Sequence, residues 1–118
     1  MSGSDLRTEQ SIVKLARSMT GYVEHTLVSL GAKGMIYAGA GGVFRLHNQP
    51  VPVKSTVGAG DTALAAFLAA MQREIPAQAA ARYAVAAGSA SVTLDGTDIV
   101  TPTMVETFLP EVSLRFLR

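Results

Sequence analysis

A glycine-rich turn that runs directly into an apolar helix constrains this chain more than any other feature. The turn is Gly58-Ala59-Gly60-Asp61, and glycine permits backbone angles and close approaches that a side chain forbids. Asp61 stands where an N-cap or first-turn residue is expected. Apolar side chains then recur at helical spacing, which predicts one apolar helix face. That face comprises Leu64, Phe67, Leu68, Met71 and Ile75.

The start of this predicted helix has the properties of an anion site. The first N–H groups of a helix have no partner within it, and they lie at the positive end of its dipole. Two glycines leading into such a terminus allow an anion to approach the backbone. The alternative is a glycine turn that Asp61 caps for structural reasons alone, because short glycine motifs give many false matches.

Composition narrows the class of protein. The chain has 118 residues, which fits one domain, and 48% are hydrophobic, so a core can form. A net charge of +1 without a basic stripe argues against nucleic acid and anionic membranes as partners. The absence of cysteine excludes disulfides and thiolate metal sites. With no apolar signal segment and no apolar run of ~20 residues, we expect a cytoplasmic protein.

The order of predicted elements is that of a layered α/β protein. Helices are predicted at 8–20, after a frayed lead-in, from Asp61 to near Ile75, and at 77–92. A last helix is predicted after its cap, Thr101, with Pro102 at the first position and Pro110 ending it. Strands are predicted at 26–30 (buried and parallel), 35–38 and 43–46 (a hairpin), 51–53 (an edge strand) and 112–117, with a turn at 95–97. The last helix should pack through Met104, Val105, Phe108 and Leu109.

The turn and its flanks resemble a known family. Ser55-Thr56-Val57-Gly58-Ala59-Gly60-Asp61-Thr62 is similar to the signature of the ribokinase-like (PfkB) carbohydrate kinases. Lys54-Ser55-Thr56 looks most like the 1-phosphofructokinase and tagatose-6-phosphate kinase branch. From about Thr8 onward the motifs follow the order of the family's C-terminal portion. The resemblance implies one partial domain, residues 1–118, with the C-terminal portion of a ribokinase-like three-layer, Rossmann-like fold.

The same resemblance implies a reaction and its residues. Asp61 would be the base that takes a proton from the acceptor sugar as its oxygen attacks the γ-phosphate of ATP. The N–H groups of Val57, Gly58, Ala59 and Gly60 would stabilise the phosphoryl charge. Cofactors would be ATP and Mg²⁺, and the substrate a sugar phosphate. The nucleotide would contact positions in three segments: Ser29, Gly31, Gly34, Val57, Gly58, Gly60, Ala87 and Ser91.

Each of these positions also has a structural interpretation. The Ser29–Gly34 segment follows a buried strand and could be only a turn into the hairpin. Ala87, Gly88 and Ser91 lie on a helix rich in small residues, which suits tight helix packing as well as an adenine wall. Gly39 to Gly42 reads as a flexible hairpin loop. Isolated His25 and His47, with no metal-ligand spacing, predict no protein-borne metal site, and Lys33 and Arg45 read as solvated charges.

The chain also departs from the family. Residues 65 and 66 are Ala-Ala where many relatives have Ala-Gly. The family's sugar-binding residues and its acidic magnesium motif lie upstream of what this sequence contains. We therefore expect little kinase activity from the chain alone, and we expect self-association through uncovered surfaces. The alternative is a nucleotide- or anion-binding module without catalysis. A dinucleotide-binding domain is disfavoured, since the third glycine and the later acidic residue are missing.

Overall fold

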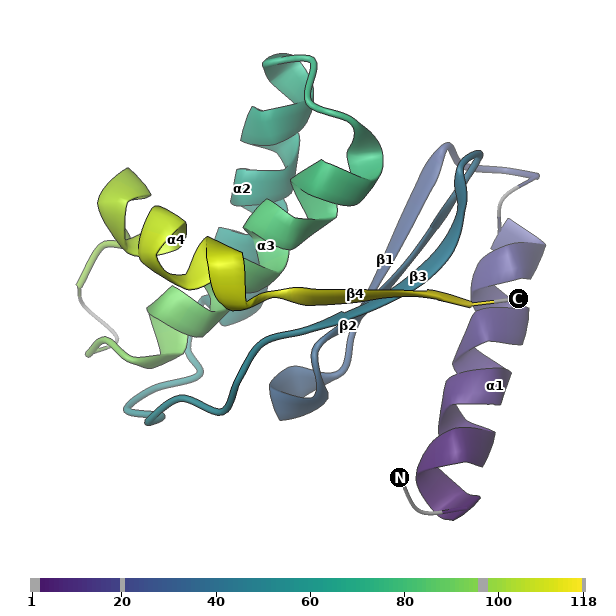
Figure 1. Cartoon of the computed structure of the whole chain (residues 1–118), viewed down its shortest axis with the longest axis horizontal. Helices are drawn as coiled ribbons and strands as arrows, with labels where there is room; N and C mark the ends of the chain where they lie inside the picture. The colour runs from purple at the N-terminus through teal and green to yellow at the C-terminus, as the bar shows by residue number, and fades with distance from the viewer. Residues whose placement is uncertain (1–2, 20, 96–97, 118) are drawn as a thin grey trace.

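The computed structural model describes residues 3–19, 21–95 and 98–117 as a sheet with helices on both faces (Figure 1). The helices are α1 (Gly3–Met19), α2 (Ala59–Gln72), α3 (Ala77–Val92) and α4 (Pro102–Phe108). The strands are β1 (His25–Ser29), β2 (Met35–Gly39), β3 (Gly42–His47) and β4 (Ser113–Leu117). Two short 3₁₀ turns, η1 (Gly31–Lys33) and η2 (Leu109–Glu111), complete the order.

The four strands form one antiparallel sheet in the order β1-β2-β3-β4. The predicted hairpin is confirmed, with Tyr37 of β2 opposite Phe44 of β3 and Leu27 of β1. The prediction that residues 26–30 form a parallel strand is wrong within the described sheet. The chain turns back through η1 at once, whereas a parallel partner needs a crossover of a dozen or more residues. Residues 25–28 of β1 are only half-buried and Ser29 is exposed, so the predicted full burial of this strand is wrong as well.

Alternate residues of the sheet enter two separate cores. Tyr37, Phe44 and Leu46 face α2 and α3, whereas Ile36 and Val43 face α1. Figure 1 shows α1 on one side of the sheet and α2, α3 and α4 on the other. Because successive strand side chains point to opposite faces, this alternation produces the three-layer arrangement. The predicted α/β fold class is confirmed.

Helix α1 is held to the sheet by a buried carboxylate. It begins at Gly3, so the frayed lead-in is wrong for residues 3–7, while residues 1, 2 and 20 lie outside the described residues. Glu9 is only 6% exposed, and its Oε2 accepts from Arg45 Nη1 at 2.6 Å and Arg115 Nη2 at 2.9 Å. Arg45 also donates to the Lys33 carbonyl. Arg45 is therefore not the solvated charge that its sequence context indicated.

Helix α2 buries only part of the face predicted for it: Phe67 lies in the core, and Met71 and Ile75 pack against that core. Its buried residues are Ala63, Phe67 and Ala70. Leu64 and Leu68 are 49% and 53% exposed. The prediction is wrong for Leu64 and Leu68, because the short alanine side chains at 63 and 70 pack into the core in their place. The helix ends at Gln72, and Glu74 then adopts a positive φ of 60°.

The remaining predictions divide between confirmed and wrong. Helix α3 has the predicted bounds, and Thr101 Oγ1 caps α4 by accepting from the Met104 N–H. Residues 51–53 do not form the predicted edge strand. The predicted turn at 95–97 includes residues 96 and 97, which lie outside the described residues. Among the described residues, no helix combines the length and hydropathy needed to cross a membrane.

Candidate functional site

The loop before α2 presents backbone N–H groups at a helix terminus. Gly58 is the N-cap and is left-handed, with φ 76° and ψ 0°, a conformation that favours glycine. The Val57 N–H donates to Ser55 Oγ at 3.2 Å, and the Ala59 N–H donates to the Thr56 carbonyl at 3.3 Å. Within the described residues, the N–H groups of Gly58 and Gly60 have no acceptor. Half of the predicted anion-binding amides are therefore already engaged.

Asp61 lies in the first turn of α2, and the cap position belongs to Gly58. Its side chain is exposed, and the described part of the chain supplies it with no hydrogen bond or ion pair. A carboxylate without a structural partner, close to open N–H groups, is free to accept a proton from a bound group. The Asp61 N–H is itself a first-turn donor without an acceptor among the described residues. Because Asp61 is the third residue of the helix, the sequence could have indicated that its N–H has no partner within the helix.

The carboxyl end of α3 fixes this loop in place. The Val92 carbonyl accepts from the Lys54 N–H at 2.7 Å and from the Ser55 N–H at 3.3 Å. A Cβ added to Gly88 would meet Ala63 Cβ at 3.8 Å and the Ala59 carbonyl oxygen at 4.0 Å. Both distances are ordinary van der Waals contacts, so the space beside Gly88 would admit an alanine side chain. No sequence signal identified the Val92 carbonyl, because this contact joins segments far apart in the chain.

Ser29, Gly31 and Gly34 surround the β1–β2 turn. Gly31 and Gly34 have φ of 61° and 96°, and a Cβ at Gly34 would collide with the Leu46 carbonyl oxygen. The backbone conformation of the turn is therefore sufficient to explain why glycine occupies both positions. Strands β1 and β3 run in the same direction because each is antiparallel to β2. The turn after β1 and the segment that leads from β3 to Gly58 thus leave the same end of the sheet (Figure 1).

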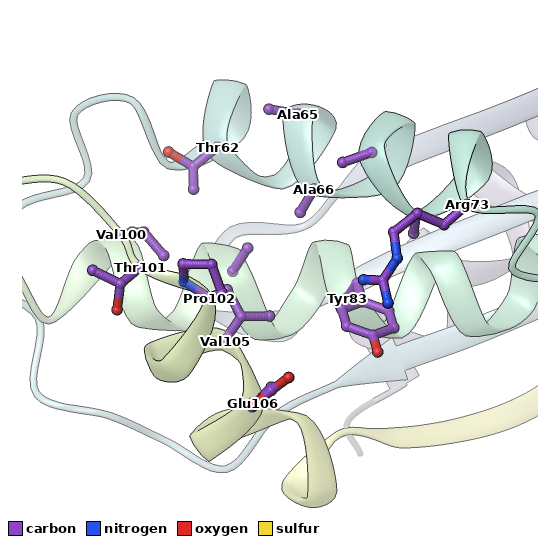
Figure 2. A pocket seen from close by; sticks show the side chains of 13 residues that line it. Thr62, Ala65, Ala66, Arg73, Tyr83, Val100, Thr101, Pro102, Val105 and Glu106 are labelled. Carbon is purple, nitrogen blue, oxygen red and sulfur yellow. The ribbon is translucent and has the colours of Figure 1, made fainter.

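A pocket of about 340 Å³ lies on another side of α2, between α2, α3 and α4. Figure 2 shows side chains of the three helices facing one another across it, including Thr62, Tyr83, Val105 and Glu106. Ala87 lines this pocket, but Ser91, Asp61 and the glycines of the loop do not. The predicted nucleotide residues are thus not gathered around one pocket in this chain. The described residues contain no group of three or more acidic or histidine side chains suited to a metal.

His25 is not isolated, as its sequence context indicated. Its Nδ1 lies 2.8 Å from the Tyr37 hydroxyl, and its ring lies edge-on to Phe67 with centroids 5.7 Å apart. Burial raises the pKa of the Tyr37 phenol. This cluster joins β1 and β2 to α2, the helix that carries Asp61.

Comparison with curated proteins finds sugar kinases. The chain is 32% identical over 91 residues to the 1-phosphofructokinase of Bacillus subtilis, covering 77% of this chain and 29% of that protein. It is 32% identical over 108 residues to the ribokinase of Haemophilus influenzae, covering 91% of this chain and 35% of that protein. The chain therefore spans about a third of the length of these relatives.

Solved structures and a family model agree with this. A candidate phosphofructokinase from Staphylococcus aureus matches with TM-score 0.82 and 27% identity, covering 99% of this chain and 36% of that one. Phosphofructokinase-2 from Escherichia coli, in complex with potassium, matches with TM-score 0.78 and 25% identity, covering 93% and 34%. The pfkB family carbohydrate kinase model matches residues 1–104. With this match over most of its length, and with the glycine turn and Asp61 at the start of α2, the chain belongs to the pfkB family of carbohydrate kinases.

Proposed function

We propose that this chain is the catalytic part of an ATP-dependent kinase that phosphorylates a hydroxyl of a sugar phosphate, with Asp61 as the base. One observation carries the proposal: an exposed carboxylate without a structural partner stands beside open N–H groups at the start of α2. Phosphoryl transfer requires alignment and charge stabilisation above all. Asp61 would take the proton of the attacking hydroxyl, and the nearby amides would stabilise the transferring phosphoryl group.

The amides that bind the phosphoryl group differ in part from those expected. Val57 and Ala59 already donate to Ser55 and Thr56. We assign the role to the N–H groups of Gly58, Gly60 and Asp61, which have no acceptor in the described chain. The dipole of α2, fourteen residues long, adds to their positive potential. The hydrogen bonds of Val57 and Ala59 hold the loop in the shape that exposes the other three groups.

ATP and Mg²⁺ fit this arrangement in different ways. The ATP phosphates would lie against the amides at the start of α2, while Ser29 and the η1 turn leave the same end of the sheet and would border the rest of the nucleotide. Mg²⁺ is commonly bound through substrate phosphates together with one or two carboxylates, so a metal carried on ATP leaves Asp61 to act as the base. When bound, Mg²⁺ would neutralise phosphate charge during transfer.

The sequence is proposed to form one partial domain, residues 1–118. The relatives are about three times as long, and the residues that hold the acceptor sugar in them are proposed to lie outside the matched third. A sugar phosphate is the preferred acceptor class because Lys54-Ser55-Thr56 resembles the 1-phosphofructokinase branch. A nucleotide-binding module without catalysis is the second candidate, since the chain covers so little of each relative.

Nucleotide titration and an ADP-release assay separate these two functions. The chain alone should bind ATP weakly, because Asp61 repels the phosphates, and Asp61→Asn should tighten that binding. It should release little ADP with fructose 1-phosphate, fructose 6-phosphate or tagatose 6-phosphate. Robust turnover of any of these sugars would contradict the expectation that the acceptor site lies elsewhere.

A chimera tests the role of Asp61 directly. In the Bacillus subtilis 1-phosphofructokinase, the matched residues would be replaced by those of this chain. Asp61→Asn in this chimera should lower kcat at least about 100-fold, the lower range for general base catalysis, and leave ATP binding largely intact. Near-normal turnover of the variant would show that Asp61 is not the base. A chimera that binds ATP with no turnover even before mutation would favour the binding module.

A further inference from the structure

The pocket between α2, α3 and α4 has the size and the lining of a small-molecule site. Its volume of about 340 Å³ falls within the ~300–1,000 Å³ of typical ligand pockets, which also occur between packed helices. Alanine methyl groups form most of the wall on the side of α2 and α3: Ala65, Ala66, Ala69, Ala70 and Ala87. Val105 adds apolar surface from α4. A ligand could therefore bury an apolar body against this wall.

Two charged side chains at the same pocket have no partner within the described chain. Arg73, the C-cap of α2, and Glu106 of α4 both line the pocket and are exposed. Neither side chain has an ion pair or a hydrogen bond among the described residues. By contrast, the guanidinium groups of four other arginines donate to a carboxylate or a carbonyl oxygen: Arg17, Arg45, Arg82 and Arg115. The pocket thus offers one positive and one negative group to a ligand.

The polar groups and the apolar wall occupy different parts of the pocket. Figure 2 shows Arg73 and Tyr83 toward one end, Thr62 and Val100 toward the other, and Glu106 on the α4 side. The Tyr83 hydroxyl has no hydrogen-bond partner in the described chain. Because an α-helix rises about 1.5 Å per residue, the side of α2 from Thr62 to Arg73 is about 16 Å long. This length accommodates a charged head group and an apolar body side by side.

We propose that this pocket binds a small zwitterion with an apolar body, of the chemical class of free amino acids with a large apolar side chain. The ligand's carboxylate would pair with the guanidinium of Arg73, whose parallel N–H donors match a carboxylate. Its ammonium would pair with Glu106 and with the ring of Tyr83. Its side chain would lie along the alanine wall and lose contact with water. A phosphate-bearing ligand is disfavoured, because it would place further negative charge beside Glu106.

This site is separate from the one proposed for phosphoryl transfer. Asp61 and the glycines of the loop before α2 do not line the pocket, and neither does Ser91. Ala87 does line it, although the family resemblance assigned that residue to the adenine wall. The proposal therefore does not rest on the proposed function, and we expect the zwitterion and ATP to bind without competing.

Three compounds with one carbon skeleton test the role of the two charges. L-Phenylalanine carries both charges, 3-phenylpropionate only the negative one and phenethylamine only the positive one. The chain would be labelled at its alanine methyl groups and titrated by NMR, and L-phenylalanine should shift the signals of Ala66, Ala69 and Ala87. We expect the two singly charged compounds to bind at least about tenfold more weakly, since each loses a charge-assisted contact. Equal affinity of all three compounds, or no shift at these alanines, would overturn the proposal.

Variants of the two charged residues test the site itself. Arg73→Gln and Glu106→Gln should each weaken the binding of L-phenylalanine about tenfold. Lys14→Gln on α1 and Glu24→Gln before β1 are the matched controls, because both residues are exposed and neither lines the pocket. Both controls should leave the affinity unchanged, and circular dichroism would check that all four variants are folded.

Two further outcomes would contradict the proposal. Equal losses of affinity in the control variants would show that L-phenylalanine responds to the net charge of the chain rather than to this pocket. Competition between ATP and L-phenylalanine would show that the pocket is the adenine wall predicted for Ala87. A chimera in which Asp61→Asn keeps its turnover would refute the proposed base and leave the zwitterion site standing.

Discussion

Replacing Glu9 with alanine should destabilise the fold more than any surface change on α1. Its carboxylate bridges Arg45 and Arg115, which lie directly opposite each other on β3 and β4. Like charges facing each other across two strands are destabilising. Glu9 thus both anchors α1 and compensates two guanidinium groups. Without Glu9, helix α1 loses its attachment to the sheet, and the two guanidinium groups face each other without a counter-charge.

The size of the effect follows from exposure. Breaking a buried ion pair by removing one partner costs about 3–5 kcal/mol. Arg45 is 17% exposed, and without Glu9 it would keep its hydrogen bond to the Lys33 carbonyl. We therefore place the cost of breaking the Glu9–Arg45 pair near the lower end of this range. Arg115 is 54% exposed, so its pair contributes at most about 1 kcal/mol. We expect Glu9→Ala to lower the free energy of unfolding by about 3 kcal/mol, a large part of the roughly 5–15 kcal/mol typical of a domain.

Urea unfolding followed by circular dichroism measures this loss. With an m-value of about 2 kcal/mol/M, the midpoint should fall by about 1.5 M. Arg115→Ala serves as the control and should cost less than about 1 kcal/mol. In the double variant, the two losses should sum to more than the measured total, because Arg115 and Glu9 interact directly. If Glu9→Ala costs no more than Arg115→Ala, the buried pair with Arg45 does not anchor α1.

Three further changes test the packing around the site. Tyr37→Phe should cost about 0.5–1.5 kcal/mol at pH 9 through its contact with His25. Because burial raises the pKa of the Tyr37 phenol above 10.0, folding holds this proton more tightly, so stability is lost as pH rises beyond 10. Urea midpoints at pH 9 and 11 should therefore differ less in the phenylalanine variant. Gly34→Ala should unfold the β1–β2 turn, because the new Cβ meets the Leu46 carbonyl, and thermal melting reports it. Phe67→Ala should cost about 3–5 kcal/mol in urea; a loss under about 1 kcal/mol would contradict its place in the core.

Local chemistry was sufficient to predict most elements. Pro76 and the spacing of small residues gave the bounds of α3, and Thr101 followed by Pro102 located the start of α4. The glycine hairpin between β2 and β3 was equally clear. These features depend on caps, fixed proline angles and turn residues, all of which act within a few positions of the chain. The family signature around Asp61 is local in the same way.

Contacts between distant segments decided the rest. Sequence could not show that β1 pairs antiparallel, because strand direction depends on which partner packs beside it. Nor could it show that Leu64 and Leu68 remain exposed while two alanines of α2 are buried, or that the Val92 carbonyl holds Lys54 and Ser55 before the anion site. Hydrophobicity states that a side chain favours burial. Only the packed neighbours determine which apolar faces find cover, and in this chain the face beside Asp61 does not.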